Sequence, residues 1–146
     1  KLSERQRSDL RYHSQVFNLS QFLHGEQGAL LCAARIVKDA PQLESKFYAA
    51  TQVMDEARHV EAYRRLLTEK FRFAYPISKP LQTLLEQALN DPRWDFTYLG
   101  MQVLIEGLAL AAFQRIRDTA KNNLASSVNA YVMQDEARHV TFGRLA

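Results

Sequence analysis

The six-residue sequence DEARHV occurs twice in this chain, at residues 55–60 and again at residues 135–140. Each copy contains a Glu followed three positions later by a His, and a single Glu lies thirty residues before each of those glutamates. On a helix, Glu and His three residues apart project from one face, so each copy can supply one oxygen and one nitrogen ligand. Four carboxylates and two imidazoles that meet at one point form the ligand set of a two-metal site. The expected metal ligands, and with them the expected catalytic residues, are Glu26, Glu56, His59, Glu106, Glu136 and His139.

The charges of these side chains favour metal binding over burial as ion pairs. Glu26 and Glu106 stand among apolar residues at helical spacing, where a carboxylate is costly unless it is paired or metal-bound. The four glutamates carry a charge of about −4, which two divalent cations cancel and two histidines cannot. Oxygen-rich ligation with two imidazoles suits iron or manganese, whereas structural zinc prefers thiolates. We therefore expect two iron ions, with a manganese–iron pair as the alternative.

Acidic and basic residues of the repeated sequence are expected to support the histidines. Asp at i and His at i+4 lie on adjacent stripes of a helix, so each Asp points towards the other copy. We expect the Asp of each copy to accept the outer N–H of the other copy's His, which fixes both tautomers. The Arg three residues after each Asp then pairs with these carboxylates, although ordinary surface ion pairs are the alternative. The residues are Asp55, Asp135, Arg58 and Arg138, with Asp135 expected at His59 and Asp55 at His139.

Further candidate residues are expected close to the metals. Tyr63 lies one turn after His59 and either contacts the metals or holds a radical, or is a buried tyrosine with a satisfied hydroxyl. Gln102, four residues before Glu106, either orients that ligand or lines a substrate pocket. A dry pocket beside the metals is expected from four apolar side chains. They are Leu30, Val103, Leu110 and Phe113.

The chain as a whole predicts four long helices that position these ligands. Only four prolines and five glycines occur among the 146 residues, and the apolar spacing is mostly helical. We expect helices over residues 8–39, 42–71 and 93–119 and from 123 to the end, with a loop at 72–80 and a short helix at 81–90. Short connections around Pro41 and around residues 121–122 predict two antiparallel hairpins. The long crossover between the second and third long helices makes those two helices parallel, so a single all-α domain, a four-helix bundle, is expected.

The two hairpins form an internal repeat at an offset of 80 residues. Aligning Glu26 with Glu106 brings Arg35 onto Arg115 and the sequence DEARHV onto itself. A pseudo-two-fold axis is therefore expected between the hairpins, with the metal pair on it.

The composition is that of an ordinary globular protein, with 47% hydrophobic and 24% charged residues and a formal net charge of +3. Because Lys and Arg are scattered, we expect no nucleic-acid binding. No uninterrupted apolar stretch approaches the roughly 18 residues of a membrane helix, so no membrane partner is expected. The single Cys32 excludes an internal disulfide and suits a reducing, cytoplasmic compartment. The chain starts with Lys and its helical pattern has no stop signal, so we expect a piece of a longer protein.

With these residues in place, the chain resembles the ferritin-like di-iron carboxylate superfamily over nearly its whole length. The DExRH form of both motifs is most similar to its oxidase and oxygenase branch, which includes the hydroxylase subunits of bacterial multicomponent monooxygenases and the ribonucleotide reductase small subunits. The resemblance implies a ferritin-like bundle whose ferrous pair activates O2 and oxidises or oxygenates a small organic substrate. Electrons would come from an external donor or reductase, and a homodimer is a further expectation. Leu110 stands where those monooxygenases carry Thr, and Tyr63 stands where the reductase small subunit has its radical tyrosine.

Two other functions fit the same residues. A ferritin-like ferroxidase or iron-storage protein has subunits of about this size, although a mineral store needs an acidic inner surface and this chain is net basic. A metal-free helical interaction bundle predicts unchanged stability after chelation. Under the metal hypothesis, removing the ions leaves four crowded carboxylates, so the protein binds extra protons or loosens.

Overall fold

The structure is a computed structural model that describes residues 1–119 and 123–145. All regular secondary structure in these residues is helical, which confirms the all-α fold class. The elements, with η marking π-helical segments, are α1 (Glu4–Asp39), α2 (Leu43–Arg65), η1 (Leu66–Phe71), α3 (Lys79–Asn90), α4 (Trp94–Tyr98), η2 (Leu99–Ile105), α5 (Glu106–Thr119) and α6 (Asn123–Leu145).

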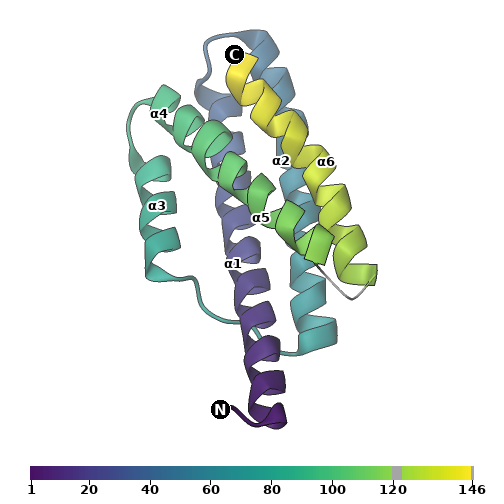
Figure 1. Ribbon diagram of the computed structural model, residues 1–146. Coiled ribbons are helices and arrows are strands. Elements are labelled where there is room, and N and C mark those ends of the chain that lie inside the picture. The colour runs from purple at the N-terminus through teal and green to yellow at the C-terminus, as the bar shows by residue number, and fades with distance from the viewer. Residues whose placement is uncertain (120–122, 146) are drawn as a thin grey trace.

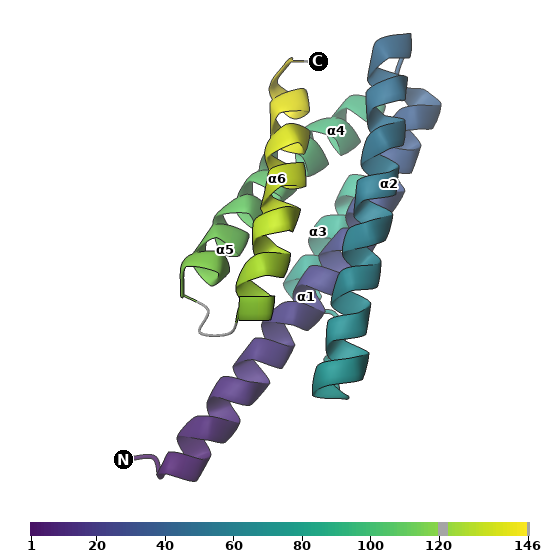
Figure 2. The same ribbon diagram turned by 90° about the vertical axis from the view of Figure 1, so that its right-hand side faces the viewer.

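Four long helical segments run alongside one another, because α4, η2 and α5 form one continuous helix. Figures 1 and 2 show α1 and α2 as one antiparallel pair and α5 and α6 as another. The crossover that contains α3 returns the chain to the opposite end, so α2 and α5 run in the same direction, as expected (Figure 1). The turn expected around residues 121–122 lies outside the described residues.

The helix ends follow from local hydrogen bonding and from proline. The first helix begins at Glu4, earlier than the expected residue 8, because Ser3 and Gln6 form a capping box with bonds of 2.9 and 3.2 Å. It ends at Asp39 because Ala40 precedes a proline and adopts an extended conformation. The crossover helix begins at Lys79, earlier than the expected residue 81, because proline is accepted in the first turn of a helix.

The crossover helix α3 is fixed against α1. Gly28 permits the close approach, because a Cβ atom at this position would collide with the side chain of Leu85. Arg35 then donates a hydrogen bond of 2.7 Å to the carbonyl oxygen of Leu89. These contacts hold the crossover along the outer side of α1, away from α2 and α6 (Figure 1).

Two segments with π-helical geometry were not expected from the sequence. At the end of η1, Arg72 takes a left-handed conformation with φ of 53° and terminates the helix. The second segment, η2, lies directly before Glu106, whose N–H bonds the carbonyl oxygen of Met101, five residues earlier. Because a π turn contains an extra residue, the consecutive side chains of Met101 and Gln102 both face inward and are 0% exposed.

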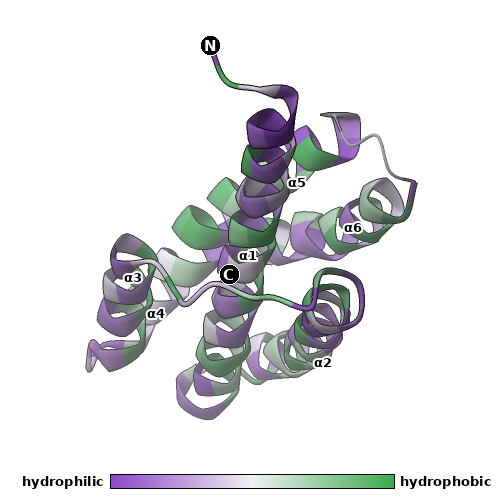
Figure 3. Ribbon diagram, turned by 90° about the horizontal axis from the view of Figure 1, so that it is seen from below, coloured by the Kyte–Doolittle hydropathy of each residue, from purple (hydrophilic) through white to green (hydrophobic). Residues whose placement is uncertain are grey.

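Buried apolar residues lie on either side of the predicted ligands. Along α1, Glu26 lies between Leu19, which belongs to one apolar cluster, and Ala29, which belongs to another. The first cluster consists of Val16, Leu19, Tyr63, Leu67, Phe113 and Val132. The second consists of Ala29, Cys32, Leu85, Ala88 and Met101. The first turns of α1 extend beyond the other helices and are largely hydrophilic (Figures 2 and 3).

The third long helix, Trp94–Asp118, is long and apolar enough to cross a membrane by length and composition alone, because an 18-residue window of it has a mean hydropathy of 1.5. Only 33% of that window is buried, and Leu99, Leu104 and Leu108 are exposed on the helix. The property is weak support for a membrane span, because core helices of other proteins share it.

Candidate metal centre

The six predicted ligands meet in the middle of the helices, and none is more than 5% exposed. Glu26 comes from α1, and the first residue of α5 is Glu106. The two Glu–His pairs come from α2 and α6, where three-residue spacing places each pair on one helix face. The structure therefore brings together every side chain that the sequence nominated as a ligand.

The ligand atoms form two overlapping groups, and within each group they lie within 4.8 Å of one another. We call these groups the His59 position and the His139 position. Glu56 and Glu136 belong to both, whereas Glu26 belongs only to the first and Glu106 only to the second. Each group has three carboxylates and one imidazole, which is a donor set for one divalent cation.

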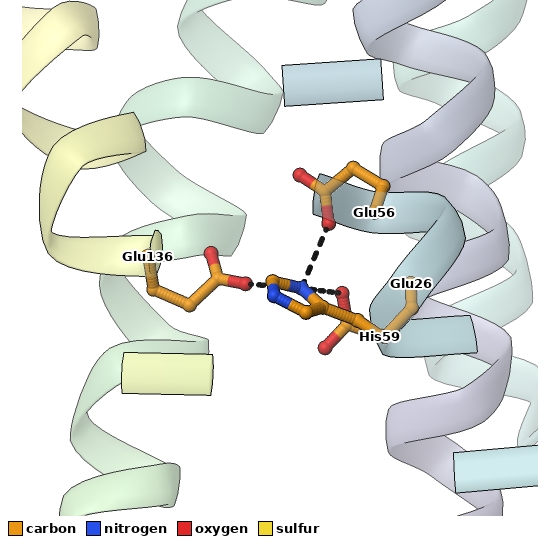
Figure 4. Close-up of side chains that lie close together, drawn as sticks. All are labelled: Glu26, Glu56, His59 and Glu136. Atoms are coloured by element: carbon orange, nitrogen blue, oxygen red, sulfur yellow. Dashed lines mark hydrogen bonds and ion pairs between the residues drawn. The ribbon is translucent and has the colours of Figure 1, made fainter. Parts of the chain in front are cut away.

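The shared carboxylates each direct one oxygen to each histidine. In Glu56, Oε2 lies 3.3 Å from His59 Nδ1, and Oε1 lies 3.3 Å from His139 Nδ1. In Glu136, Oε1 lies 3.2 Å from His59 Nδ1, and Oε2 lies 3.3 Å from His139 Nδ1. Figure 4 shows the His59 ring between Glu26, Glu56 and Glu136. Both shared carboxylates are thus placed to bridge two cations.

The outer nitrogen of each histidine contacts an aspartate of the other hairpin, as expected. His59 Nε2 lies 3.1 Å from Asp135 Oδ2, and His139 Nε2 lies 3.3 Å from Asp55 Oδ2. An aspartate at Nε2 favours the tautomer that carries its proton there. The lone pair of Nδ1 is then directed at the ligand cluster, as a metal ligand requires.

Two arginines close the outer side of the site. Arg58 donates to Asp55 and lies 3.6 Å from Asp135 Oδ2. Arg138 donates to Asp135 and lies 3.4 Å from Asp55 Oδ2. The Asp55 and Asp135 side chains are only 12% and 19% exposed, whereas the Arg58 and Arg138 side chains are 61% and 55% exposed, so these ion pairs join the buried site to the surface. Each arginine therefore connects the two hairpins.

The crowding of acids perturbs the protonation of the cluster. Burial raises the pKa of Glu26 and of Glu106 well above the usual range, and the charge of Glu136 adds to the effect on Glu106. Burial also acts to raise the pKa of Glu136, but hydrogen bonds with Glu106 and the two histidines outweigh it and lower that pKa. Burial acts to lower the pKa of His59 and His139, but hydrogen bonds with the carboxylates outweigh it and raise both pKa values. The cluster thus holds either protons or cations.

Unsatisfied oxygen atoms show that the site suits a cation. Three buried oxygens have no hydrogen-bond partner among the described residues: Gln102 Oε1, Glu56 Oε2 and Glu136 Oε1. The two glutamate oxygens lie 3.3 and 3.2 Å from His59 Nδ1. Leaving a buried polar atom unsatisfied costs about 1–3 kcal/mol, and more for a charged group. Both atoms face the His59 position, where a divalent cation satisfies them together. The oxygen-rich donor set with imidazole fits iron or manganese.

Gln52 is a site residue that was not singled out from the sequence. It is 0% exposed, and its Nε2 donates to Glu56 Oε1 at 2.9 Å and to Glu106 Oε1 at 3.1 Å. Gln102 contacts this amide, donating from Nε2 to Gln52 Oε1 at 2.6 Å. Gln52 lies four residues before Glu56, as Gln102 lies four before Glu106, so the same spacing would have found both.

Tyr63 lies in the apolar cluster at the Glu26 end of the site. Its hydroxyl donates to Asn129 Oδ1 at 3.1 Å, and burial raises its pKa well above the usual range. Its ring packs near Phe22 and Phe113. The structure therefore gives Tyr63 a buried ring and a satisfied hydroxyl.

The structure buries only one of the four residues that were expected to line a substrate pocket. Phe113 is buried, but the other three nominated residues are half-buried at the surface: Leu30, Val103 and Leu110. One described hollow lies beside α3 and α4, between Leu84 and Phe96, and another lies beside Phe17 and Tyr75. Neither is lined by the nominated residues.

A scan against protein-family models, a search of curated proteins and a search of solved structures each gave no match. The resemblance to the ferritin-like di-iron carboxylate superfamily therefore rests on the motifs of this chain and on their spacing.

Proposed function

We propose that this chain is a non-haem di-iron oxidoreductase that activates O2 to oxidise or oxygenate a small organic substrate. The observation that supports this best is the pair of buried four-residue groups that share Glu56 and Glu136. A pair of ferrous ions, when bound there, supplies electrons for the reduction of O2. A manganese–iron pair fits the same donors.

The residues of the chain have distinct roles in this proposal. Glu26 and His59 would hold one cation, Glu106 and His139 would hold the other, and Glu56 and Glu136 would be shared between them. Four carboxylates with two neutral imidazoles balance two divalent cations, so the loaded site is close to neutral. The aspartates at the outer histidine nitrogens hold both rings in the ligating tautomer.

The surroundings favour oxidation chemistry that is protected from water. The six ligands are at most 5% exposed, and an apolar cluster that includes Tyr63 and Phe113 lies at one end of them. Exclusion of water strengthens the electrostatic interactions in the site and limits side reactions of reactive oxygen species. Repeated turnover requires an external electron donor, so a reductase partner is part of the proposal.

A ferroxidase with an iron-storage role would use the same ligands. The net charge of +3 argues against it, because an acidic interior is needed to nucleate mineral. The two functions differ in how much iron each chain oxidises.

The test is anaerobic loading with ferrous iron followed by exposure to O2. We expect two irons bound per chain, in line with the two groups of ligands, and rapid O2 consumption that stops when those irons are oxidised. Glu106→Gln removes one ligand and should reduce both iron content and O2 consumption. The matched control is Glu61→Gln, which alters an exposed glutamate paired with Arg64 at 2.8 Å and should behave as wild type.

Three results would contradict the proposal. Failure of the wild-type chain to retain iron would remove the metal site itself. Equal iron content in Glu106→Gln and wild type would show that the predicted ligands do not bind it. Oxidation of tens of irons per chain with growth of a ferric mineral would establish the storage function instead.

A further inference from the structure

The buried amide pair of Gln52 and Gln102 has a position that the roles above do not explain. Both side chains are 0% exposed. The two Nε2 hydrogens of Gln52 are directed to Glu56 Oε1 and Glu106 Oε1, at 2.9 and 3.1 Å. Its Oε1 accepts the 2.6 Å hydrogen bond from Gln102. Both N–H groups and the oxygen of the Gln52 amide thus have hydrogen-bond partners, and these three bonds fix the orientation of the amide.

The backbone around Gln102 is held equally closely. Gln102 lies in the π-helical segment η2 and packs against Gly143 of α6. A Cβ atom at position 143 would lie 2.7 Å from Gln102 Cβ and 2.9 Å from its carbonyl oxygen. Only glycine leaves room for this contact, which sets how far Gln102 reaches towards Gln52.

The amide pair serves only one of the two cation positions. Glu106 belongs to the His139 position, and Glu56 Oε1 is the oxygen that faces His139. At the offset of 80 residues that relates the two hairpins, Gln52 aligns with Val132, which is buried in the apolar cluster. The oxygens that face the His59 position, Glu56 Oε2 and Glu136 Oε1, receive no such amide hydrogen bond and lie 3.3 and 3.2 Å from His59 Nδ1.

We propose that Gln52, oriented by Gln102, is a positioning residue that fixes Glu56 and Glu106 for the cation of the His139 position and makes the two positions unequal. The inference rests on the proposed function in one respect, which is that two cations bind. The first cation enters the His59 position, because two of its oxygens, Glu56 Oε2 and Glu136 Oε1, accept no hydrogen bond from an amide or another neutral donor. The second enters the His139 position, where two oxygens also accept hydrogen bonds from Gln52.

The test is a titration of the metal-free chain with Co²⁺, followed by calorimetry and by the visible absorption of the bound ion. We expect two binding events of different affinity in the wild type. Gln52→Met keeps a side chain of similar length but has no donor. It should weaken the second event by about 10–100-fold and the first by less than about threefold, as for loss of other partners that orient metal ligands.

Two variants that each lack a ligand of one position show which binding event belongs to which position. Glu26→Gln removes a ligand of the His59 position only, and Glu106→Gln removes a ligand of the His139 position only. Adding Gln52→Met should weaken Co²⁺ binding and change the absorption bands in the Glu26→Gln background. In the Glu106→Gln background the same addition should have little effect.

Two further variants separate positioning from general stability. Gln102→Met should have a smaller effect of the same kind, and combining it with Gln52→Met should add little, because both act through one amide. Val132→Ala creates a cavity at the equivalent place in the other hairpin. It should lower the melting temperature and leave the ratio of the two Co²⁺ affinities unchanged.

The outcomes that overturn the inference are distinct from those that overturn the proposed function. A wild-type chain that binds fewer than two Co²⁺ ions removes both. Two bound ions whose affinities fall equally in Gln52→Met, or do not fall, remove the positioning role and leave the proposed function standing.

Discussion

Loading the metal-free chain with two divalent cations should release protons from the ligand cluster. Near pH 6, below the ordinary histidine pKa of about 6.5, both histidines hold a proton, because the effect of burial is outweighed by hydrogen bonds with carboxylates that raise their pKa. Burial also raises the pKa of Glu26 and of Glu106, which favours their protonated forms, so any proton that they hold adds to the two on the histidines. Ligands must be deprotonated to bind a metal, so at least about two protons leave for two cations. Each binding constant should then rise at least about tenfold per pH unit, which is about 1.4 kcal/mol per cation.

The release is measured with a pH indicator in weakly buffered solution while Co²⁺ is added to the metal-free chain. Glu61→Gln, which alters an exposed residue, should release the same number of protons as wild type. Glu106→Gln should release fewer, because it lacks one ligand of the His139 position and so displaces the proton of His139 less completely. Release of less than one proton per chain at full loading would refute the reasoning, as would full release by Glu106→Gln.

The remaining predictions concern stability and the support of the ligands. In the metal-free chain, the raised pKa values of the two histidines give stability that is present below pH about 6.5 and lost as the pH rises through the folded-state values, so urea midpoints should fall with rising pH. A rising midpoint would be inconsistent with this. Gly143→Ala should destabilise by about 1–3 kcal/mol through contact with Gln102, whereas Gly107→Ala, with nothing within 4 Å, should stabilise by about 0.4–1 kcal/mol. Thermal unfolding checks the pair, and shifts of the same sign would show that the close contact does not matter. Asp135→Asn should weaken Co²⁺ binding by about 10–100-fold in a direct titration, because the outer nitrogen of His59 loses a charged acceptor. Unchanged affinity would show that this acceptor does not support the ligand.

The ligand cluster could be predicted from the sequence because helical periodicity converts spacing into direction. Glu56 and His59 are three residues apart and therefore share a helix face, and the second copy of the motif repeats this at Glu136 and His139. The thirty-residue separation from Glu26 to Glu56 spans a hairpin, so both return to the same level. The contact of each aspartate with the opposite histidine followed from the same periodicity.

The structural differences between the two hairpins could not be predicted from the spacing of the motifs. Residues 99–105 align with residues 19–25 at the offset of 80, yet the first stretch is π-helical and the second is α-helical. Helix propensity does not distinguish these forms, and the close contact of Gln102 with Gly143 in the π-helical stretch is made only in the folded chain. The extra residue in the turn sends Gln102 to the amide of Gln52 and not to Glu106.

The four-residue spacing before Glu56 could have nominated Gln52, but the spacing alone gives no role for it. A neutral amide on a helix gives no charge imbalance to explain, whereas a glutamate among apolar residues does. Its role depends on two carboxylates from different helices, α2 and α5, that only the fold brings together. The early start of α1, by contrast, depends on neighbouring residues only, because the capping box is formed by Ser3 and Gln6, three residues apart in the sequence.

The most direct test of the central claim is anomalous X-ray diffraction at the iron edge from crystals of the ferrous-loaded chain. We predict two peaks, one bounded by Glu26 and His59 and the other by Glu106 and His139, with Glu56 and Glu136 beside both. Absence of both peaks, with the glutamates paired to basic side chains or turned outward, would contradict it.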